Sequence, residues 1–181
     1  MCNFTLKLNA RLTPIDREDI YEYPLGDILE ENDIGRVKGG DSFLAENGEI
    51  AYCEIKITLN EQCEKSINHL LQAIDALGVP KGSVLKGVNI NEPVGRLEGL
   101  ALYMNETELP EEVYTSCDIN YAIEQICRLL NGIGEFHSYM EKQDETALYF
   151  YGSSYHEMKD LIRPFIKSYP LCKKSKLKQI A

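Results

Sequence analysis

A repeated order of secondary-structure patterns constrains the fold more than any other feature of this sequence. The first half predicts four strands from alternating or continuous apolar runs, at Phe4–Leu12, Gly35–Leu44, Glu49–Leu59 and Ser83–Val88. It also predicts a short helix opened by Pro24 and an amphipathic helix over Glu61–Leu77. The second half predicts strands and helices in the same order, with strands at Gly99–Met104, Gly134–Glu141, Thr146–Tyr151 and Lys176–Ile180 and helices at Asp118–Leu130 and Ser154–Tyr169. The chain therefore reads as one βαββαβ unit written twice.

This element order is typical of a four-stranded antiparallel sheet with two helices on one face. We therefore predict an α+β protein, a tandem duplication of a ferredoxin-like βαββαβ unit with antiparallel sheets. The repeats are expected at residues 1–90 and 97–181, joined by a linker over 87–99 and packed as one compact body. Hydrophobic residues make up 44% and charged residues 27% of the 181 residues, a composition that allows a buried core.

Strand alternation also predicts which side chains lie on the sheet face that carries no helix. In Glu49–Leu59 the odd positions are expected to face the helices and the even positions to face away. Five tyrosines fall on such helix-free faces: Tyr52, Tyr103, Tyr139, Tyr149 and Tyr151. We favour a structural role, in which the repeats pack there and the phenol groups are hydrogen-bonded. The functional alternative is an aromatic surface that binds a partner.

Acidic residues dominate the charge of the chain, which is −10 from 19 bases and 29 acids. The stretch Asp16–Asp33 holds eight acids and one base, and no base lies between Arg96 and Arg128. Such a surface repels phosphate backbones, so we expect no nucleic-acid partner. It attracts basic proteins, although acidity can also serve solubility alone. Besides the tyrosines, the residues that we predict to contact a basic protein partner are Asp27, Glu30, Glu31, Glu54, Glu108, Glu111 and Glu112.

Motifs for enzymatic chemistry are missing from the sequence. It has no nucleophile elbow, Walker loop, GxGxxG, HExxH or paired CxxC. Gly39-Gly40-Asp41-Ser42 lies inside a predicted strand, which favours a β-bulge over a phosphate loop. His156 and Asp160 are spaced as a helical i, i+4 pair, but no third metal ligand can be placed from the sequence. We therefore expect no catalytic residue, no metal and no cofactor.

The sequence also bears on the compartment. No apolar run approaches the ~20 residues that a helix needs to cross a bilayer. The N-terminal alternation MCNFTLKLNARL lacks the apolar segment of a signal peptide. The six cysteines are scattered, as is typical of reduced thiols in a cytosol. We therefore predict a cytoplasmic protein with no membrane partner.

Four segments resemble a bacterial family of duplicated ferredoxin-like proteins: Gly35–Gly40, Gly48–Ile55, Val79–Ser83 and Glu145–Gly152. The resemblance spans most of the chain and implies the same doubled fold. Members of that family are similar in size and acidity to immunity proteins, which neutralise bacterial toxins. The resemblance supplies no catalytic residues.

Two functional hypotheses follow. The first is a non-catalytic cytosolic binding protein, of the immunity or inhibitor type, that uses its acidic surface to block a basic toxin or enzyme. The second is a small-molecule-binding enzyme or sensor with a pocket between the repeats, with Glu54, Lys56, His137 and Asp144 as candidates. A scaffold subunit that docks through Lys173–Lys178 is a third possibility, although lysines there also suit a protected edge strand.

Overall fold

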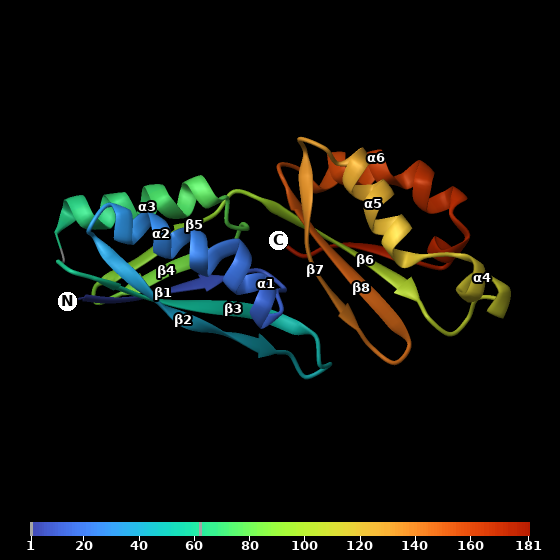
Figure 1. The fold of residues 1–181 in the computed structure, drawn as a ribbon, viewed down its shortest axis with the longest axis horizontal. Helices are drawn as coiled ribbons and strands as arrows, with labels where there is room; N and C mark the ends of the chain where they lie inside the picture. Colours follow the sequence, from blue (N-terminus) through green and yellow to red (C-terminus); the bar gives the residue numbers. More distant parts are fainter. Residues whose placement is uncertain (1, 62) are drawn as a thin grey trace. The chain divides into compact units, whose positions relative to one another are not determined.

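A computed structural model describes residues 2–61 and 63–181, so Met1 and Gln62 lie outside the described residues (Figure 1). The described residues divide into two compact units, the first within residues 2–97 and the second over residues 98–180. Each unit contains a β-sheet with helices on one face (Figure 1). Within the described residues, no helix is long and apolar enough to cross a membrane.

The described residues of the first unit form one antiparallel sheet in the order β2-β3-β1-β4-β5. Its strands are β1 (Cys2–Leu8), β2 (Gly35–Leu44), β3 (Ile50–Leu59), β4 (Ser83–Gly87) and β5 (Ile90–Val94). In the register, Leu6 of β1 lies opposite Ile55 of β3 and Leu85 of β4, and all three side chains are buried. The odd positions of β3 from Cys53 to Leu59 are buried as predicted, because alternate residues of a strand share a face.

The first helical segment of this unit is longer than predicted. It consists of α1 (Pro14–Arg17), the π-helical turn η1 (Glu18–Glu22) and α2 (Tyr23–Glu31) without a break. Thr13 caps its start by accepting a hydrogen bond from the Asp16 backbone N–H, and Pro14 occupies the first helical position. Pro24 does not open a helix but continues one. Its missing N–H and its ring disrupt the α-helical bond to the preceding turn, and a π-turn there is a common accommodation.

The second helix, α3 (Glu64–Leu77), begins three residues later than predicted. The predicted start included Gln62, which lies outside the described residues. The helix ends at Gly78, which has a φ of +66°, a left-handed conformation that glycine adopts without a steric penalty. Helices α2 and α3 cover the same face of the sheet (Figure 1).

The described residues of the second unit form an antiparallel sheet in the order β7-β8-β6-β9. Its strands are β6 (Glu98–Asn105), β7 (Gly134–Glu141), β8 (Glu145–Gly152) and β9 (Lys176–Gln179). Helices α5 (Ile119–Leu129) and α6 (Tyr155–Ser168) cover one face, and Asp118 and Ser154 cap their N-terminal ends. Their apolar sides pack on buried residues of the sheet, among them Leu100, Leu102, Leu148 and Phe150.

Both units have the connectivity of the predicted fold class. Numbered from its first strand, each unit places strand 1 between strands 3 and 4, with strand 2 beyond strand 3. The protein is therefore an α+β protein built from a duplicated, ferredoxin-like βαββαβ unit, which confirms the predicted class.

Three segments correct the predicted arrangement. Residues 87–99, predicted as a linker, contain strand β5, which pairs with β4 and extends the first sheet. Helix α4 (Glu111–Ser116) and the 3-10 turn η2 (Pro170–Cys172) were not predicted. Each is short, so its hydrophobic periodicity spans too few residues to be detected in the sequence.

Candidate functional site

The candidate site is an acidic hollow in the first unit, between the helical segment and strand β2. It encloses about 380 Å³. Its walls come from η1, α2 and β2, and the lining residues are Glu18, Glu22, Tyr23, Gly26, Asp27, Glu30, Val37 and Gly39. Four of these eight residues carry a carboxylate and none is a lysine or arginine. We call this site the acidic hollow.

The β2 side of the acidic hollow is shaped by a β-bulge. The register of β2 against β3 shifts between Val37 and Gly40, which confirms the bulge predicted for the Gly-Gly pair. Gly39 has a φ of +93°, a conformation that side-chain-bearing residues rarely adopt. The bulge interrupts the regular face of the strand here, and the residue at position 39 has no side chain to fill the hollow.

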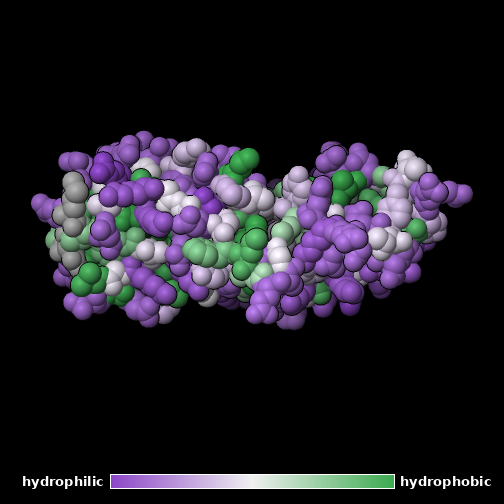
Figure 2. All heavy atoms as spheres, turned by 90° about the horizontal axis from the view of Figure 1, so that it is seen from below, coloured by the Kyte–Doolittle hydropathy of each residue, from purple (hydrophilic) through white to green (hydrophobic). Residues whose placement is uncertain are grey.

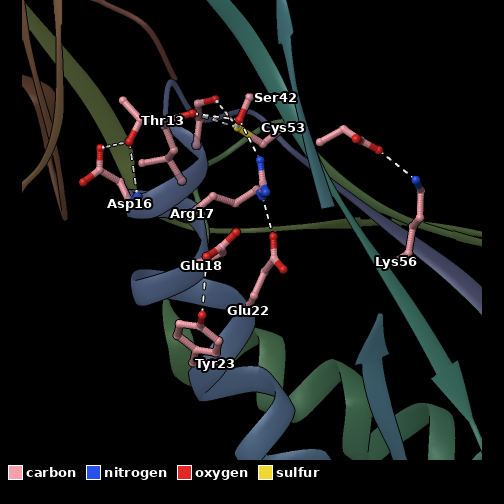
Figure 3. Close-up of polar contacts among 12 residues, drawn as sticks. Thr13, Asp16, Arg17, Glu18, Glu22, Tyr23, Ser42, Cys53 and Lys56 are labelled. Atoms are coloured by element: carbon pink, nitrogen blue, oxygen red, sulfur yellow. Dashed lines mark hydrogen bonds and ion pairs between the residues drawn. The ribbon is translucent and has the colours of Figure 1, made fainter. Parts of the chain in front are cut away.

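A buried ion pair supports the wall of the acidic hollow. The Arg17 guanidinium lies 2.5 Å from Glu22, measured from Nε to Oε1, and only 4% and 6% of the two residues are exposed. Arg17 Nη1 also donates a hydrogen bond of 2.8 Å to Ser42 Oγ, which connects the helical segment to β2 (Figure 3). The π-turn between the two charged residues places positions five apart on the same side of the helical segment. The positive charge of Arg17 is therefore compensated by Glu22 within the first unit.

The thiol of Cys53 lies at the inner end of this network. Its Sγ is 3.5 Å from Ser42 Oγ and 3.6 Å from the carbonyl oxygens of Ala10 and Leu12 (Figure 3). Burial raises the pKa of the Cys53 thiol, so it stays protonated near neutral pH. A protonated, fully buried thiol is a poor nucleophile, and Cys53 therefore acts in packing.

Tyr23 is the exposed aromatic residue of the acidic hollow, and 60% of it is exposed. Its hydroxyl donates a hydrogen bond of 3.4 Å to Glu18 Oε2 (Figure 3). The Glu18 carboxylate is the main cause that raises the pKa of the Tyr23 phenol, so the ring carries no charge of its own at neutral pH. The sequence did not indicate Tyr23, because the partner-binding tyrosines were predicted from strand alternation and Tyr23 lies in a helix. Its place inside the acid-rich stretch is a signal that could have found it.

Only some of the predicted acidic residues line the acidic hollow. Asp27 and Glu30 line the acidic hollow, and Glu31 follows them as an exposed residue of α2. The other predicted acids, Glu108, Glu111 and Glu112, are exposed in the second unit. Glu108 there pairs with Lys174 at 3.1 Å from Oε2 to Nζ. Sequence analysis had not gathered Glu18 and Glu22 into a site with Asp27.

The five predicted tyrosines have different environments. Tyr103, Tyr149 and Tyr151 are buried, whereas 48% of Tyr139 is exposed. Tyr52 is half-buried and stacks on Phe43, with a centroid distance of 4.7 Å. The Lys7 ammonium lies 3.7 Å from the centre of the Tyr52 ring, a cation–π arrangement. None of these five tyrosines lines the acidic hollow.

The residues predicted for a small-molecule pocket are divided between the two units. Glu54 is half-buried on β3, and the neighbouring Lys56 Nζ lies 2.7 Å from Asp41 Oδ2 at an exposed position. His137 is buried beside the Tyr151 ring in the second unit. Asp144 is exposed between β7 and β8. Neither unit by itself therefore brings these four residues together.

The acidic hollow differs in charge from a larger hollow in the second unit. This larger hollow, of about 520 Å³, has Lys142 in its lining beside Glu106, Asp118 and Glu141, so its charge is partly balanced. On the face drawn in Figure 2, hydrophilic residues predominate and the described hydrophobic residues form small, scattered groups. Within residues 2–61 and 63–181, no group of three or more His, Cys, Asp or Glu side chains could hold a metal ion.

Comparison with known proteins adds little to this description. The sequence matches no protein-family model and no curated protein. Among solved structures, the chain is similar to a candidate monooxygenase from Lactobacillus acidophilus NCFM, at 7% identity over 98% of this chain and 91% of that chain, with a TM-score of 0.33. It is also similar to the first two RRM domains of the yeast poly(U)-binding protein Pub1, at 9% identity over 99% of both chains, with a TM-score of 0.27. At such low identities and TM-scores, neither likeness bears on what this chain binds.

Proposed function

We propose that this protein is a non-catalytic, cytosolic binding protein that uses the acidic hollow to hold a basic protein partner. The observation that carries the proposal is a hollow whose lining has four carboxylates, an exposed aromatic ring and no base. The charge of Glu22 is already compensated by Arg17, so a basic side chain that enters the hollow would meet the charges of Glu18, Asp27 and Glu30. The net charge of −10 adds long-range attraction for a basic partner.

An immunity or inhibitor role is the form of binding that suits these features best. Inhibitors of this kind need no reaction machinery, because they act by covering a partner's functional surface. Charge complementarity accelerates the encounter, and contacts in a concave site slow dissociation. The chain resembles a bacterial family of duplicated ferredoxin-like proteins whose members are similar to immunity proteins in size and acidity, which supports a basic toxin or enzyme as the partner class.

The test is capture and reconstitution with matched charge variants. The protein would be immobilised at low ionic strength and exposed to a lysate of its own organism, and a captured protein would then be purified. The test variant is Asp27→Asn with Glu30→Gln, and the control is Glu111→Gln with Glu112→Gln, which changes the net charge equally. We expect the purified partner to be basic, to lose its activity when bound, and to bind the test variant at least about tenfold more weakly than the control.

Two results would contradict the proposal. One is that no basic protein is retained at low ionic strength. The other is a reconstituted complex whose affinity falls equally in the test and control variants, because that outcome assigns binding to net charge and not to the acidic hollow.

A further inference from the structure

We infer that the group recognised in the acidic hollow is an arginine side chain of the partner and not a lysine. The inference rests on the proposed function, since it names the chemistry of the basic group that enters. Three features support it: a buried carboxylate with an unused oxygen, an exposed aromatic ring, and carboxylates spaced along one side of α2.

The first feature is the Glu22 carboxylate. Glu22 is only 6% exposed, and a buried carboxylate is stabilised by hydrogen bonds to both of its oxygens. Arg17 Nε occupies Oε1, but no other described residue donates a hydrogen bond to Oε2. Oε2 lies on the side of Gly39, where a Cβ would be 3.9 Å away, and both residues line the acidic hollow. A donor that enters the hollow would therefore complete the coordination of this carboxylate.

The second feature is the Tyr23 ring, which lines the same hollow as Glu22. A guanidinium is planar and weakly hydrated, so it can stack on an aromatic face while its N–H groups bond to carboxylates. A lysine ammonium is a compact and strongly hydrated charge that gains less from a partly open aromatic site. The Tyr23 hydroxyl donates a hydrogen bond to Glu18, so the ring lies next to a second carboxylate. The aromatic ring and the carboxylates together therefore suit a guanidinium, which is planar and has several N–H donors.

The third feature is the arrangement of charge along α2. Tyr23, Asp27 and Glu30 are spaced by four and three residues, so they share one side of the helix. Val37 and Gly26 supply an apolar part of the lining, against which the methylenes of an arginine can pack. The five N–H donors of a guanidinium can reach two carboxylates at once, whereas an ammonium acts as a point charge.

The test compares two peptides that differ in one residue. The full chain, labelled with ¹⁵N, would be titrated at low ionic strength with acetyl-Gly-Ser-Arg-Ser-Gly-amide and with the same peptide containing Lys in place of Arg. We expect the amide signals of Tyr23, Gly26 and Gly39 to shift, and the arginine peptide to bind about fivefold more tightly. Tyr23→Leu should reduce this preference to below about twofold, whereas Tyr23→Phe should preserve it because the ring remains. The Glu111→Gln variant is the control and should bind like the wild type.

The outcomes separate the inference from the proposed function. Equal binding of both peptides at the acidic hollow would overturn the arginine inference and leave a general basic partner in place. Failure of both peptides to shift any residue of the hollow would contradict the inference and the proposed function together. A dilution series of the protein without peptide tests whether a second copy of this chain occupies the hollow. Concentration-dependent shifts of the same residues would assign the hollow to a second copy of this chain, whose lysine-rich segment Lys173–Lys178 is basic, and would overturn the inference.

Discussion

Gly40 lies at the bulge of β2, between the helical segment and strand β3. A Cβ at this position would lie 2.8 Å from Glu22 Oε1 and 3.0 Å from Arg17 Nε. It would also overlap the backbone carbonyl oxygen of Glu54, which cannot move without breaking the β-ladder. The absence of a side chain at residue 40 is therefore a condition for the buried ion pair next to the acidic hollow.

The substitution Gly40→Ala tests this close approach. We expect it to lower the free energy of unfolding by ~2 kcal/mol or more, because the methyl group displaces both members of a buried ion pair. The matched control is Gly26→Ala, whose Cβ would meet Val37 at an ordinary 3.9 Å. In the helix interior that change should raise the free energy of unfolding by about 0.5–1 kcal/mol. Urea unfolding of both variants measures the difference, and similar values for the two would contradict the packing described at Gly40.

The cysteines give a second prediction at the residue scale. The hydrogen bond with Ser66, 3.1 Å from Cys63 Sγ to Oγ, lowers the pKa of the exposed Cys63 thiol. Burial raises the pKa of Cys172 to about 12. Because the thiolate is the reactive form, we expect iodoacetamide at neutral pH to label Cys63 at least about tenfold faster than Cys172. Peptide mass spectrometry would follow the labelling.

The variant Ser66→Ala checks the cause of this reactivity. A lowered pKa means that the labelling rate of Cys63 rises at a lower pH than it would for an ordinary thiol. Without the Ser66 hydroxyl, the pH profile of Cys63 labelling should move to higher pH, while Cys172 should stay slow. An unchanged profile would show that the hydrogen bond does not stabilise the thiolate.

At the scale of elements, the π-turn η1 is what makes the buried ion pair possible. It places Arg17 and Glu22, five residues apart, in hydrogen-bonding contact. We expect Arg17→Met to destabilise the first unit by ~3–5 kcal/mol, because it leaves a buried carboxylate without a cation. The double variant Arg17→Met with Glu22→Gln should recover part of that loss, since the uncompensated charge is then gone. Chemical unfolding of the two single variants and the double variant forms the test, and strictly additive effects would contradict direct coupling of the pair.

Elements also show how far the sequence could predict the structure. Strands β2 and β7 have the predicted bounds, and helices α5 and α6 begin one residue after their predicted starts, because strand and helix periodicity depend on neighbouring residues. The helical run before Pro24 was missed, since proline was taken as a helix start and a π-turn has no simple hydrophobic period. Asp27 was among the predicted partner-binding residues. Glu22 was not, because its place in the lining of the acidic hollow depends on the π-turn and on the fold of β2.

At the scale of the whole molecule, the acids divide between the two units and differ in their surroundings. In the first unit, the bulge and the helical segment hold four carboxylates around one hollow. In the second unit, Glu111 and Glu112 lie in the first turn of α4, and the nearby Glu108 is paired with Lys174. Acids of both units contribute to the long-range field, which depends on total charge and weakens with salt. Only acids that touch the bound partner also slow its dissociation.

Two triple variants of equal charge change would separate these contributions. One removes charge from the acidic hollow (Glu18→Gln, Asp27→Asn and Glu30→Gln), and the other removes it from the second unit (Glu106→Gln, Glu111→Gln and Glu112→Gln). With the purified partner at low ionic strength, both variants should lower the association rate by about two- to threefold, because steering follows total charge. The dissociation rate should rise about tenfold or more in the hollow variant only, because contacts in the bound state are lost there. Surface plasmon resonance over a salt series measures both rates. Faster dissociation of the second-unit variant would instead place the partner on that unit, away from the acidic hollow.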